Sequence, residues 1–578
     1  MPRNTHNIYC RSVTKIFSFL KKSDSIREAY LNAIEIDESG FLVPFCKCHL
    51  NDLNLFEKIS DLILANKSYY PDEVTETEEN IKLWLEKLST NIDDSILFLV
   101  EDNIGHLKGL VGFSNCHNKN LIMEVSFIAG LDYSFDSLFA KGIHQLIKWA
   151  RTTINCDGFI TKNLKSTTQT QEFYKNIGFS SQNNVNLSID YAVPEDNNVE
   201  YLSYDENKKI GESLILTAGP SISQLESTYA FDAAANGWNN SWSKYLTLFE
   251  NEFTKYVDAK YALATSSCTG ALQIALMALD IGEGDEVIVP DQTWVATANA
   301  VRYVGATPVF ADVELDSWNL DPSSVEALIT DRTKAIMPVH MYGHPTRMTK
   351  ILEIAKKYNL KIVEDAAPAI GAEWEGKRCG SFGDFAGFSF QGAKLLVTGE
   401  GGMLVTSNEE LFLKAKKIWD QGRNPNSSRA FWIDSEGVKF KMSNVQAAVG
   451  LGQLQRADEL IEMKRRLFGW YEEELGDLDC LQLNKEVEGA RSIYWMSSIF
   501  VNENAKCGRD ELMSFLKKKN IDTRPVFPAI SQYPIWNVSQ SSQPNAKLIG
   551  DNAMNLPSGV CLSHEEVKYV AKSIRSLV

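Results

Sequence analysis

The sequence lacks the features that mark several classes of protein. Its ten cysteines include no C-x-x-C pair, so they indicate neither a disulfide framework nor a common zinc site, and the spacing of Cys46, Cys48 and His49 does not match the usual zinc patterns. No apolar run reaches about 18 residues, and lysines interrupt the apolar run of the basic N-terminus, so we expect neither a membrane span nor secretion. Positive charge is in deficit, because the net charge is -17. That field repels nucleic-acid phosphates and acidic membranes, and we expect a cytoplasmic protein with reduced thiols and neither kind of partner.

What is present is typical of a globular protein. Hydrophobic residues make up 44% of the 578 residues and there are only 17 prolines, so a chain of this length predicts three or four compact units. The segment VPEDNNVEYLSYDENKK is polar and acidic without clear periodicity, which is typical of a linker. We therefore expect five parts: an N-terminal extension at 1–40, a domain at 41–192, a linker at 193–210, a large domain at 211–455 and a small domain at 456–578.

Strand and helix patterns alternate in both halves and predict the α/β class. Before the linker, the strand patterns SILFLVED, LKGLVGFSN, MEVSFIAGL and GFITKN and the helix pattern SLFAKGIHQLIKWARTT predict a small mixed layer. After it, short apolar strands such as DEVIVP, TPVFADV, KAIMPVH and LKIVED alternate with amphipathic helices. That pattern favours a mostly parallel sheet covered on both faces. Ligands of such sheets bind at the carboxyl ends of the strands.

Three polar residues stand where this architecture places a ligand. Thr269 lies at a helix start, in TSSCTGALQIAL, where unpaired backbone N–H groups and the helix dipole suit a phosphate, although the same pattern is that of an ordinary N-cap. Asp365 ends the strand LKIVED, where it is placed either to hold a proton on a pyridine nitrogen or to cap the next helix. Lys394 lies among glycines and apolar residues, which lower the pKa of an amine and make it nucleophilic.

Ordered segments along about 360 residues resemble the DegT/StrS family of sugar-nucleotide aminotransferases. They are GPSI, SSCTGAL, GDEVIVP, TWVATANAV, GATPVF, VHMYGHP, VEDAA, GDFAGFSFQGAK, TGEGGMLVT, KMSNVQAAVGLGQL and TRPVFP. The resemblance implies the aspartate aminotransferase fold, with a mostly parallel seven-stranded sheet in a large domain that binds pyridoxal 5'-phosphate and a small α/β C-terminal subdomain.

The same resemblance implies the roles of individual residues. Lys394 is expected to form the Schiff base and shuttle the proton, Asp365 to contact the pyridine nitrogen and Trp294 to stack on the ring. The phosphate is expected to lie among Cys268, Thr269 and Ser389, with Lys439 added by a neighbouring subunit. Pro368 departs from the family pattern, which has Gln, His or Glu beside the cofactor's phenolic oxygen at that position.

The expected reaction is transamination between glutamate and a nucleotide-linked keto sugar, in a homodimer or higher oligomer. FSFQGAK, TGEGGM and the triplet YWM at 494–496 favour a 4-keto-6-deoxy sugar, as in perosamine synthases, over a 3-keto sugar. A histidine at position 394 would instead have indicated a deoxygenating dehydratase. A regulator that binds the cofactor without turnover is the nonenzymatic alternative, which the presence of Lys394 disfavours.

The first half resembles GNAT-type acyltransferases over roughly residues 41–191, chiefly through KNLKSTTQTQEFYKNIGF. The resemblance implies binding of acetyl-CoA or another acyl-CoA, with Tyr174 as the general acid toward the leaving thiolate; a packed tyrosine is the alternative. Where that family has a Gly-rich turn for the pyrophosphate, the residues at 134–139 are SFDSLF, without glycine. Two interpretations stay open: an enzyme that acylates the new amine, or a degenerate domain for binding or assembly.

Overall fold

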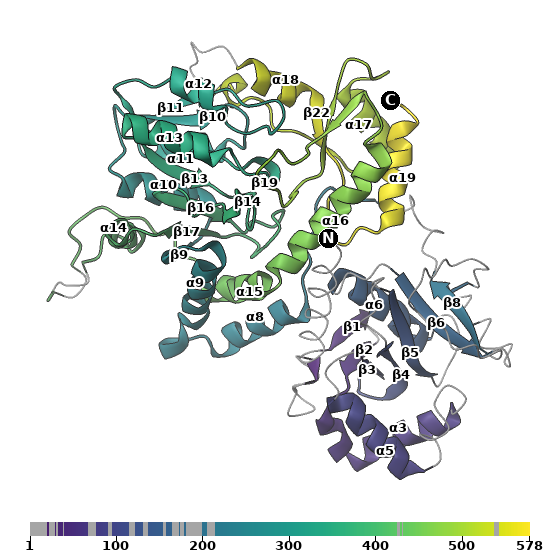
Figure 1. Cartoon of the computed structure of the whole chain (residues 1–578). Helices are drawn as coiled ribbons and strands as arrows, with labels where there is room; N and C mark the ends of the chain where they lie inside the picture. The colour runs from purple at the N-terminus through teal and green to yellow at the C-terminus, as the bar shows by residue number, and fades with distance from the viewer. Residues whose placement is uncertain are drawn as a thin grey trace. The chain divides into compact units, whose positions relative to one another are not determined.

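The computed structural model describes residues 20–21, 29, 33–37, 40–66, 77–90, 95–114, 122–130, 137–153, 158–164, 173, 179–180, 199–204, 214–424, 428–429, 432–536 and 543–578. Two compact units result. Unit 1 comprises residues 1–210 and 221–228, and unit 2 comprises 211–220 and 229–578. Each unit has its own layers of helix and sheet (Figure 1).

Unit 1 is built on an eight-stranded sheet in the order β1-β2-β3-β4-β5-β6-β8-β7. Its strands are β1 (Ile34–Asp37), β2 (Gly40–Pro44), β3 (Ile96–Asp102), β4 (Leu107–Ser114), β5 (Ile122–Gly130), β6 (Gly158–Leu164), β7 (Phe179–Ser180) and β8 (Val199–Tyr204). Its helices are η1 (Lys47–Asn51), α3 (Leu53–Ala65), α5 (Glu78–Thr90) and α6 (Leu138–Thr153). The ring of Phe139 in α6 presses on the sheet where Gly109 and Gly130 leave room, since a Cβ atom at either glycine would collide with it.

The strands of unit 1 are antiparallel except for one pair. β5 and β6 run parallel and are joined through α6, and their pairing covers only Ile122–Glu124 and Gly158–Ile160. Beyond those residues β5 continues to Gly130 and β6 to Leu164 without pairing to each other. Their pairing is therefore confined to the first three residues of each strand.

Two strands of unit 1 lie within the predicted linker and the predicted extension. The predicted linker at 193–210 contains β8, which pairs with β6 through Val199–Ser203. The predicted extension at 1–40 contains β1, which pairs with β2. Both strands are short and lie beside acidic residues, so their apolar alternation is too brief to stand out from the sequence.

Unit 2 is built on a seven-stranded sheet in the order β11-β10-β12-β13-β16-β17-β9. The strands are β9 (Tyr261–Thr265), β10 (Glu286–Pro290), β11 (Thr307–Ala311), β12 (Thr333–Ile336), β13 (Lys361–Asp365), β16 (Phe385–Ser389) and β17 (Gly402–Thr406). The four pairings from β11 to β16 are parallel, and the two that involve β17 are antiparallel. The sheet is thus mostly parallel, as expected, and its two antiparallel pairings lie at one edge.

Alternate residues of these strands pack on opposite faces of the sheet. Val287, Val289 and Leu404 belong to a cluster that includes residues of α10 (Cys268–Ala278), α11 (Ala296–Tyr303) and α14 (Glu409–Trp419). Ile288 packs on the other side, with α12 (Pro322–Ala327) and α13 (Met348–Tyr358). On the side opposite Leu404, Met403 packs with α9 (Lys244–Val257), α15 (Asn444–Gln455) and α16 (Ala457–Leu475). A fully apolar strand is stable here because helices cover both faces.

The remaining elements of unit 2 form two smaller sheets with their helices. A four-stranded sheet has the order β18-β20-β22-β21, and a three-stranded sheet has the order β15-β14-β19. Their strands are β14 (Glu373–Trp374), β15 (Lys377–Arg378), β18 (Leu481–Leu483), β19 (Ala490–Arg491), β20 (Ser498–Val501), β21 (Arg524–Pro525) and β22 (Ala553–Asn555). The other helices are α17 (Arg509–Lys518), α18 (Pro544–Asn552) and α19 (His564–Arg575), with the short η4 (Asn239–Ser241), η5 (Met341–Gly343) and η6 (Ile530–Gln532). The helix α8 (Gln224–Asn236) spans the boundary between the two units.

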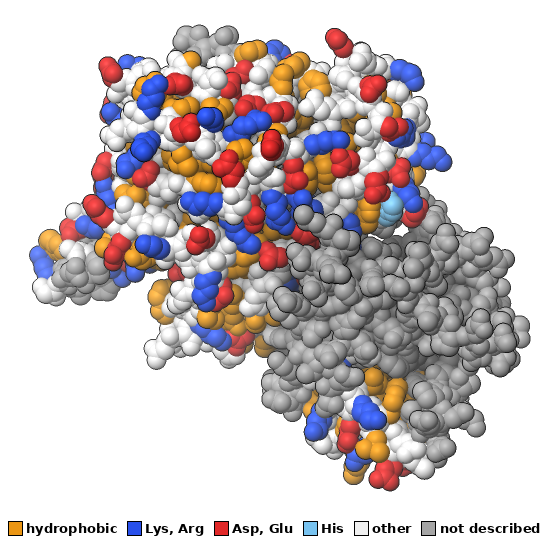
Figure 2. Space-filling model, viewed as in Figure 1, with side chains coloured by type: hydrophobic (Ala, Val, Ile, Leu, Met, Phe, Trp, Pro, Cys, Tyr) orange, Lys and Arg blue, Asp and Glu red, His pale blue; other side chains and the backbone are white. Residues whose placement is uncertain are grey.

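Acidic and basic side chains are interspersed on the face drawn in Figure 2. Among the described residues, no helix is long and apolar enough to cross a membrane. Within the same residues, no group of three or more His, Cys, Asp or Glu side chains is arranged to hold a metal ion.

Candidate active site

Six of the side chains singled out from the sequence line one cavity of unit 2, of about 490 Å³. It lies where β13 and β16 end and α10 begins, so the parallel strands deliver their carboxyl ends to it as expected. The six residues are Cys268, Thr269, Trp294, Asp365, Ser389 and Lys394.

The start of α10 forms a cradle of backbone N–H groups. Ser267 caps the helix, and its Oγ accepts the N–H of Gly270 at 3.1 Å. In the part of the chain that the structure describes, the N–H groups of Cys268 and Thr269 have no protein acceptor. Gly402 of β17 lies against this turn, where a Cβ atom would collide with the backbone of Ser267 and Cys268. Free N–H groups at the positive end of a helix dipole are suited to bind a phosphate.

Asp365, the last residue of β13, is buried and held by groups from three segments. Its Oδ2 accepts the hydroxyl of Thr297 at 2.7 Å, and its Oδ1 accepts the N–H of Ala367 at 3.1 Å. The Sγ of Cys268 lies 3.9 Å from Oδ1. A carboxylate with its orientation defined in this way is placed to face a cationic ring nitrogen.

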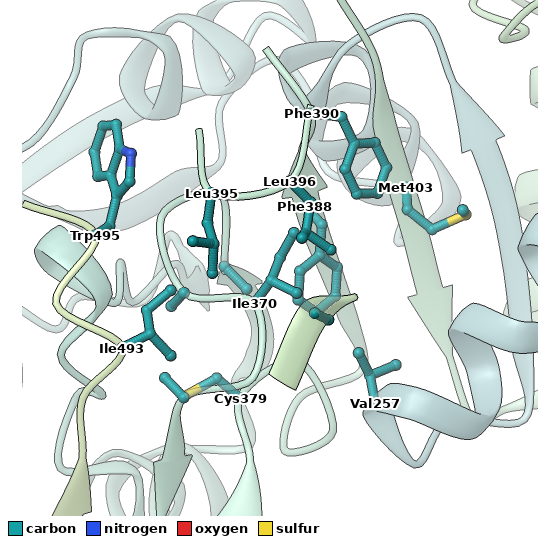
Figure 3. Packing of buried hydrophobic residues seen from close by; sticks show 14 of the residues in the cluster. Val257, Ile370, Cys379, Phe388, Phe390, Leu395, Leu396, Met403, Ile493 and Trp495 are labelled. Carbon is teal, nitrogen blue, oxygen red and sulfur yellow. The ribbon is translucent and has the colours of Figure 1, made fainter. Parts of the chain in front are cut away.

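Lys394 lies in the turn that follows β16. The residue is partly exposed because it opens onto the cavity, but burial around its amino group lowers the pKa to about 8, against the opposing effects of Asp365 and Cys268. Its neighbours Leu395 and Leu396 are buried in the core, among the side chains drawn in Figure 3. At pH 8 about half of the amine is therefore neutral, and only the neutral amine is a nucleophile.

Aromatic rings line the cavity. Trp294 is 56% exposed and lies 5.5 Å from the ring of Phe527 between centroids. The indole of Trp495 lies 3.7 Å from the Nζ of Lys394. An exposed indole face such as that of Trp294 offers flat apolar contact to an aromatic ligand.

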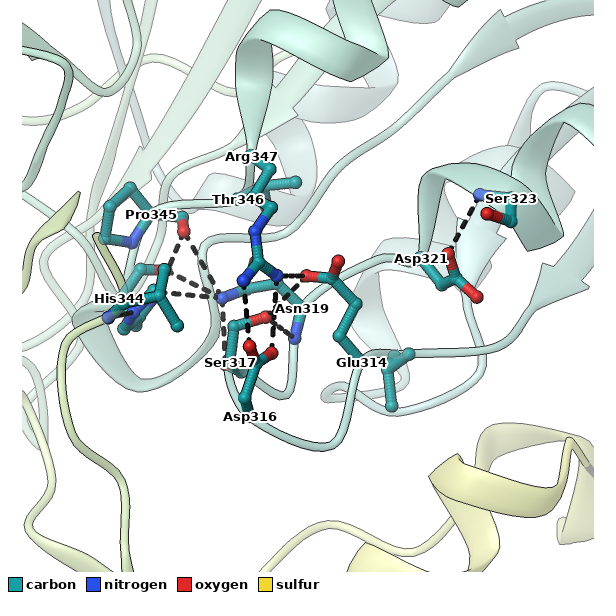
Figure 4. A network of polar contacts seen from close by, with 12 residues as sticks. Glu314, Asp316, Ser317, Asn319, Asp321, Ser323, His344, Pro345, Thr346 and Arg347 are labelled. Atoms are coloured by element: carbon teal, nitrogen blue, oxygen red, sulfur yellow. Dashed lines mark hydrogen bonds and ion pairs between the residues drawn. The ribbon is translucent and has the colours of Figure 1, made fainter. Parts of the chain in front are cut away.

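Several lining residues were missed in the sequence, namely Thr297, Met341, Trp495 and Phe527. Each lies in a segment quoted above, TWVATANAV, VHMYGHP, YWM or TRPVFP, but none was assigned a place at the site. The N–H of Met341 donates to the side chain of Asn319 at 2.8 Å. Asn319 belongs to the polar network drawn in Figure 4, where its amide donates to the carbonyl of Pro345. Trp495 and Phe527 come from segments far along the chain, which only the fold brings to the cavity.

The other three positions singled out from the sequence differ in where they lie. Lys439 is exposed and does not line the cavity of its own chain. Tyr174 lies outside the described residues. Pro368 lines the cavity, so its missing side-chain donor is a feature of the site itself.

The cavity residues fit pyridoxal phosphate on this chain's own geometry. The unpaired N–H groups at α10 suit the phosphate, Asp365 a protonated pyridine nitrogen, the face of Trp294 the ring, and the amine of Lys394 the aldehyde. All four open onto the same cavity.

Comparisons with known proteins point the same way. The family model of DegT/DnrJ/EryC1/StrS aminotransferases matches residues 220–575. The GDP-perosamine synthase of Escherichia coli O157:H7 is 41% identical over 355 residues, which are 61% of this chain and 96% of that protein. The UDP-N-acetyl-3-dehydro-alpha-D-glucosamine 3-aminotransferase of Acidithiobacillus ferrooxidans is 37% identical over 318 residues, 54% of this chain and 84% of that protein.

Among solved structures, the chain is similar to Helicobacter pylori PseC, an aminotransferase involved in the biosynthesis of pseudoaminic acid. The TM-score is 0.60 at 25% identity, and the match covers 63% of this chain and 99% of that one. With the family model spanning more than half of its length, the chain belongs to the DegT/DnrJ/EryC1/StrS aminotransferase family and is a pyridoxal-phosphate-dependent sugar aminotransferase.

Proposed function

We propose that the chain transfers an amino group from glutamate to the C4 keto group of a nucleotide-linked 4-keto-6-deoxy sugar. The observation that carries the proposal is the convergence of Lys394, Asp365 and the start of α10 on one cavity. The 41% identity to a GDP-perosamine synthase supports the C4 position. A 3-keto sugar is the alternative, which the 37% identity to a 3-aminotransferase supports.

Each cavity residue has a proposed role in this reaction. Bound pyridoxal phosphate supplies an electron sink for a carbanion. Lys394 would hold the cofactor through its Nζ; once a substrate amine displaces it, the same Nζ would be free to move a proton between the substrate carbon and the cofactor. The Asp365 carboxylate keeps the ring nitrogen protonated, while Cys268, Thr269 and Ser389 bind the phosphate and Trp294 covers the ring.

We propose that the active form is a homodimer or a higher oligomer built from dimers. In it, Lys439 of the partner subunit completes the phosphate site. The exposure of Lys439 in its own chain supports this placement, because the side chain is available to a neighbour.

The test is the visible absorption spectrum of the purified chain supplied with cofactor. We expect a band that glutamate bleaches and that one substrate from a panel of GDP-, dTDP- and UDP-linked 4-keto and 3-keto sugars restores. Lys394→Ala should abolish the band, whereas Lys350→Ala, at a lysine 63% exposed on α13, should keep it. A band that survives in Lys394→Ala contradicts the role of Lys394, and restoration by a 3-keto sugar alone selects the alternative.

A second candidate function concerns unit 1, for which we propose acylation of the new amino group with acyl-CoA. The order of the strands and helices in unit 1 supports it, with a parallel pair, β5 and β6, joined through α6 within an otherwise antiparallel sheet. The assay is mass spectrometry of the amino-sugar product with and without acetyl-CoA. An increase in mass by one acetyl group supports acylation, and an unchanged product together with no acetyl-CoA binding by calorimetry leaves a domain for binding or assembly.

A further inference from the structure

One lysine of unit 2 is buried far more completely than a lysine usually is. Lys464 of α16 is 4% exposed, although long charged side chains normally keep their ends in water. Burial lowers its pKa to about 7, and the Cys561 thiol is the titratable group that acts on it in the opposite direction. Burying a lysine costs free energy unless its N–H donors form hydrogen bonds.

Two backbone carbonyls use those donors. The Nζ of Lys464 donates to the carbonyl of Trp495 at 2.8 Å and to the carbonyl of Ser558. The hydroxyl of Ser558 in turn accepts the N–H of Ser497 at 2.9 Å. Lys464 therefore joins α16 to the segment around Trp495 and to the turn around Ser558.

Trp495 is also fixed at its other end. Its indole N–H donates to the carbonyl of Ala393 at 2.7 Å. Its ring centroid lies 3.7 Å from the Nζ of Lys394, the residue that follows Ala393. Trp495 is 6% exposed and its indole lines the cavity; Figure 3 labels it together with Leu395 and Ile493 of the same cluster. A continuous series of contacts thus runs from Lys464 through Trp495 to Lys394.

The indole excludes water from the amine of Lys394, and loss of water disfavours an ammonium ion. Its π face acts the other way, because it attracts a cation. Burial is the largest influence on the Lys394 pKa, ahead of the charges of Asp365 and Cys268, which face the amine from β13 and α10. Removing the indole should therefore admit water and favour the charged amine.

We propose that Lys464 is a positioning residue that acts through Trp495: by holding the Trp495 carbonyl, it keeps the indole against Lys394 and keeps water from the reactive amine. That this exclusion of water matters for catalysis rests on the proposed role of Lys394. The contacts themselves do not.

The experiment measures the protonation of Lys394 in the cofactor-free full chain, by pulse labelling with acetic anhydride across a pH series and mass spectrometry of the Lys394 peptide. In the unaltered chain we expect the midpoint near pH 8. Trp495→Ala should raise it by about one pH unit, and Lys464→Met should raise it in the same direction. Lys568→Met, on α19 and 42% exposed, is the matched control and should leave it unchanged.

The double variant Lys464→Met with Trp495→Ala separates positioning from a general loss of structure. If Lys464 acts through Trp495, the double variant shifts the midpoint no further than Trp495→Ala alone. Additive shifts, an unchanged midpoint in Lys464→Met, or an unchanged midpoint in Trp495→Ala overturns the proposal. If urea denaturation shows that Lys464→Met is not folded, Lys464→Gln replaces it. The same rise of the Lys394 labelling midpoint is expected, and the same criteria apply.

Failure of this proposal is distinct from failure of the proposed function. The labelling uses no cofactor. If the labelling midpoints of the Lys464 and Trp495 variants shift together but the chain shows no lysine-dependent visible band, only the role of Lys394 in transamination is refuted. A normal band with uncoupled shifts would refute only the role of Lys464.

Discussion

At the scale of single residues, the orientation of Asp365 depends on one hydroxyl. Thr297, in the first turn of α11, donates to Oδ2 at 2.7 Å and is 1% exposed. A buried hydrogen bond to a charged group contributes about 1.5–3 kcal/mol.

We therefore predict that Thr297→Val, which keeps the shape and removes the hydroxyl, weakens cofactor binding by about ten-fold or more, as about 1.5 kcal/mol implies. Titration of the cofactor-free chain with pyridoxal phosphate measures this. Thr406→Val is the control, since its buried hydroxyl donates at 2.7 Å to the carbonyl of Asp384, away from the cavity. Equal affinity losses in both variants would mean that the hydroxyl of Thr297 stabilises the fold and not the site.

A second residue, Glu250 of α9, predicts a dependence of stability on pH. Burial raises its pKa to about 7, although the N–H of Ala264, at 2.8 Å, and the charges of Lys416 and Lys441 lower it. A folded-state pKa above the unfolded value means that the folded chain binds the extra proton, so this contribution is complete below pH 4.5 and is lost as pH rises through about 7.

Glu250→Gln lacks that titration. We expect it to be more stable than the unaltered chain at pH 8, by on the order of 2 kcal/mol, with the advantage disappearing toward pH 4.5. Urea denaturation at the two pH values measures the difference. Glu252→Gln, at a glutamate 46% exposed, should show no such change with pH, and a constant difference for Glu250→Gln would contradict the prediction.

At the scale of elements, one carboxylate organises the end of β13. Glu364 is fully buried, and its two oxygens accept the N–H groups of Gly380, Phe382 and Gly383 at 2.7 Å each. The Nε2 of His340 lies 3.0 Å from the same carboxylate. Because Asp365 is the next residue, these contacts also hold the segment that carries it.

We predict that Glu364→Gln lowers the free energy of unfolding by about 3 kcal/mol, since its amide NH₂ replaces one acceptor and faces donors in a buried site. Glu353→Gln removes an exposed partner of Lys350 and should cost less than about 1 kcal/mol. Urea denaturation of both variants measures these changes in the free energy of unfolding. Similar losses in the two would show that the buried contacts of Glu364 contribute little.

Elements with a clear period were predictable from the sequence. The pattern DEVIVP predicted β10 within one residue, and SLFAKGIHQLIKWARTT predicted α6, because four or more apolar positions in register leave little choice of structure. Strands of two residues, such as β14 and β15, have no period to detect. They exist because tertiary pairing supplies their partners.

The candidate site divides in the same way. Asp365 stood out because it ends an apolar strand pattern, and Lys394 stood out because it lies among glycines and apolar residues. Trp495 could not be placed, because its indole reaches Ala393 across 102 residues of sequence. Lys464 looked like any lysine on an amphipathic helix, since only the fold determines which face of α16 is covered.

At the scale of the whole molecule, the chain has separate cores. The clusters around Phe98 and Leu99 lie in unit 1, and those around Phe388, Leu272, Leu516 and Ile351 lie in unit 2. Units with their own cores unfold as separate cooperative transitions unless they stabilise each other strongly. The cavity that carries Lys394 belongs to unit 2 alone.

Differential scanning calorimetry of the full chain should therefore show two transitions, of which pyridoxal phosphate raises only one. A free concentration of 100 times Kd stabilises by about 2.7 kcal/mol, which for a unit of this size is an increase in Tm of about 3–4 °C. Lys394→Ala should lose most of that increase, while the other transition stays where it is. Acetyl-CoA should raise that other transition if unit 1 is an acyltransferase. A single transition that follows both ligands would instead mean that the two units unfold together, and the assignment of one activity to each would lose this support.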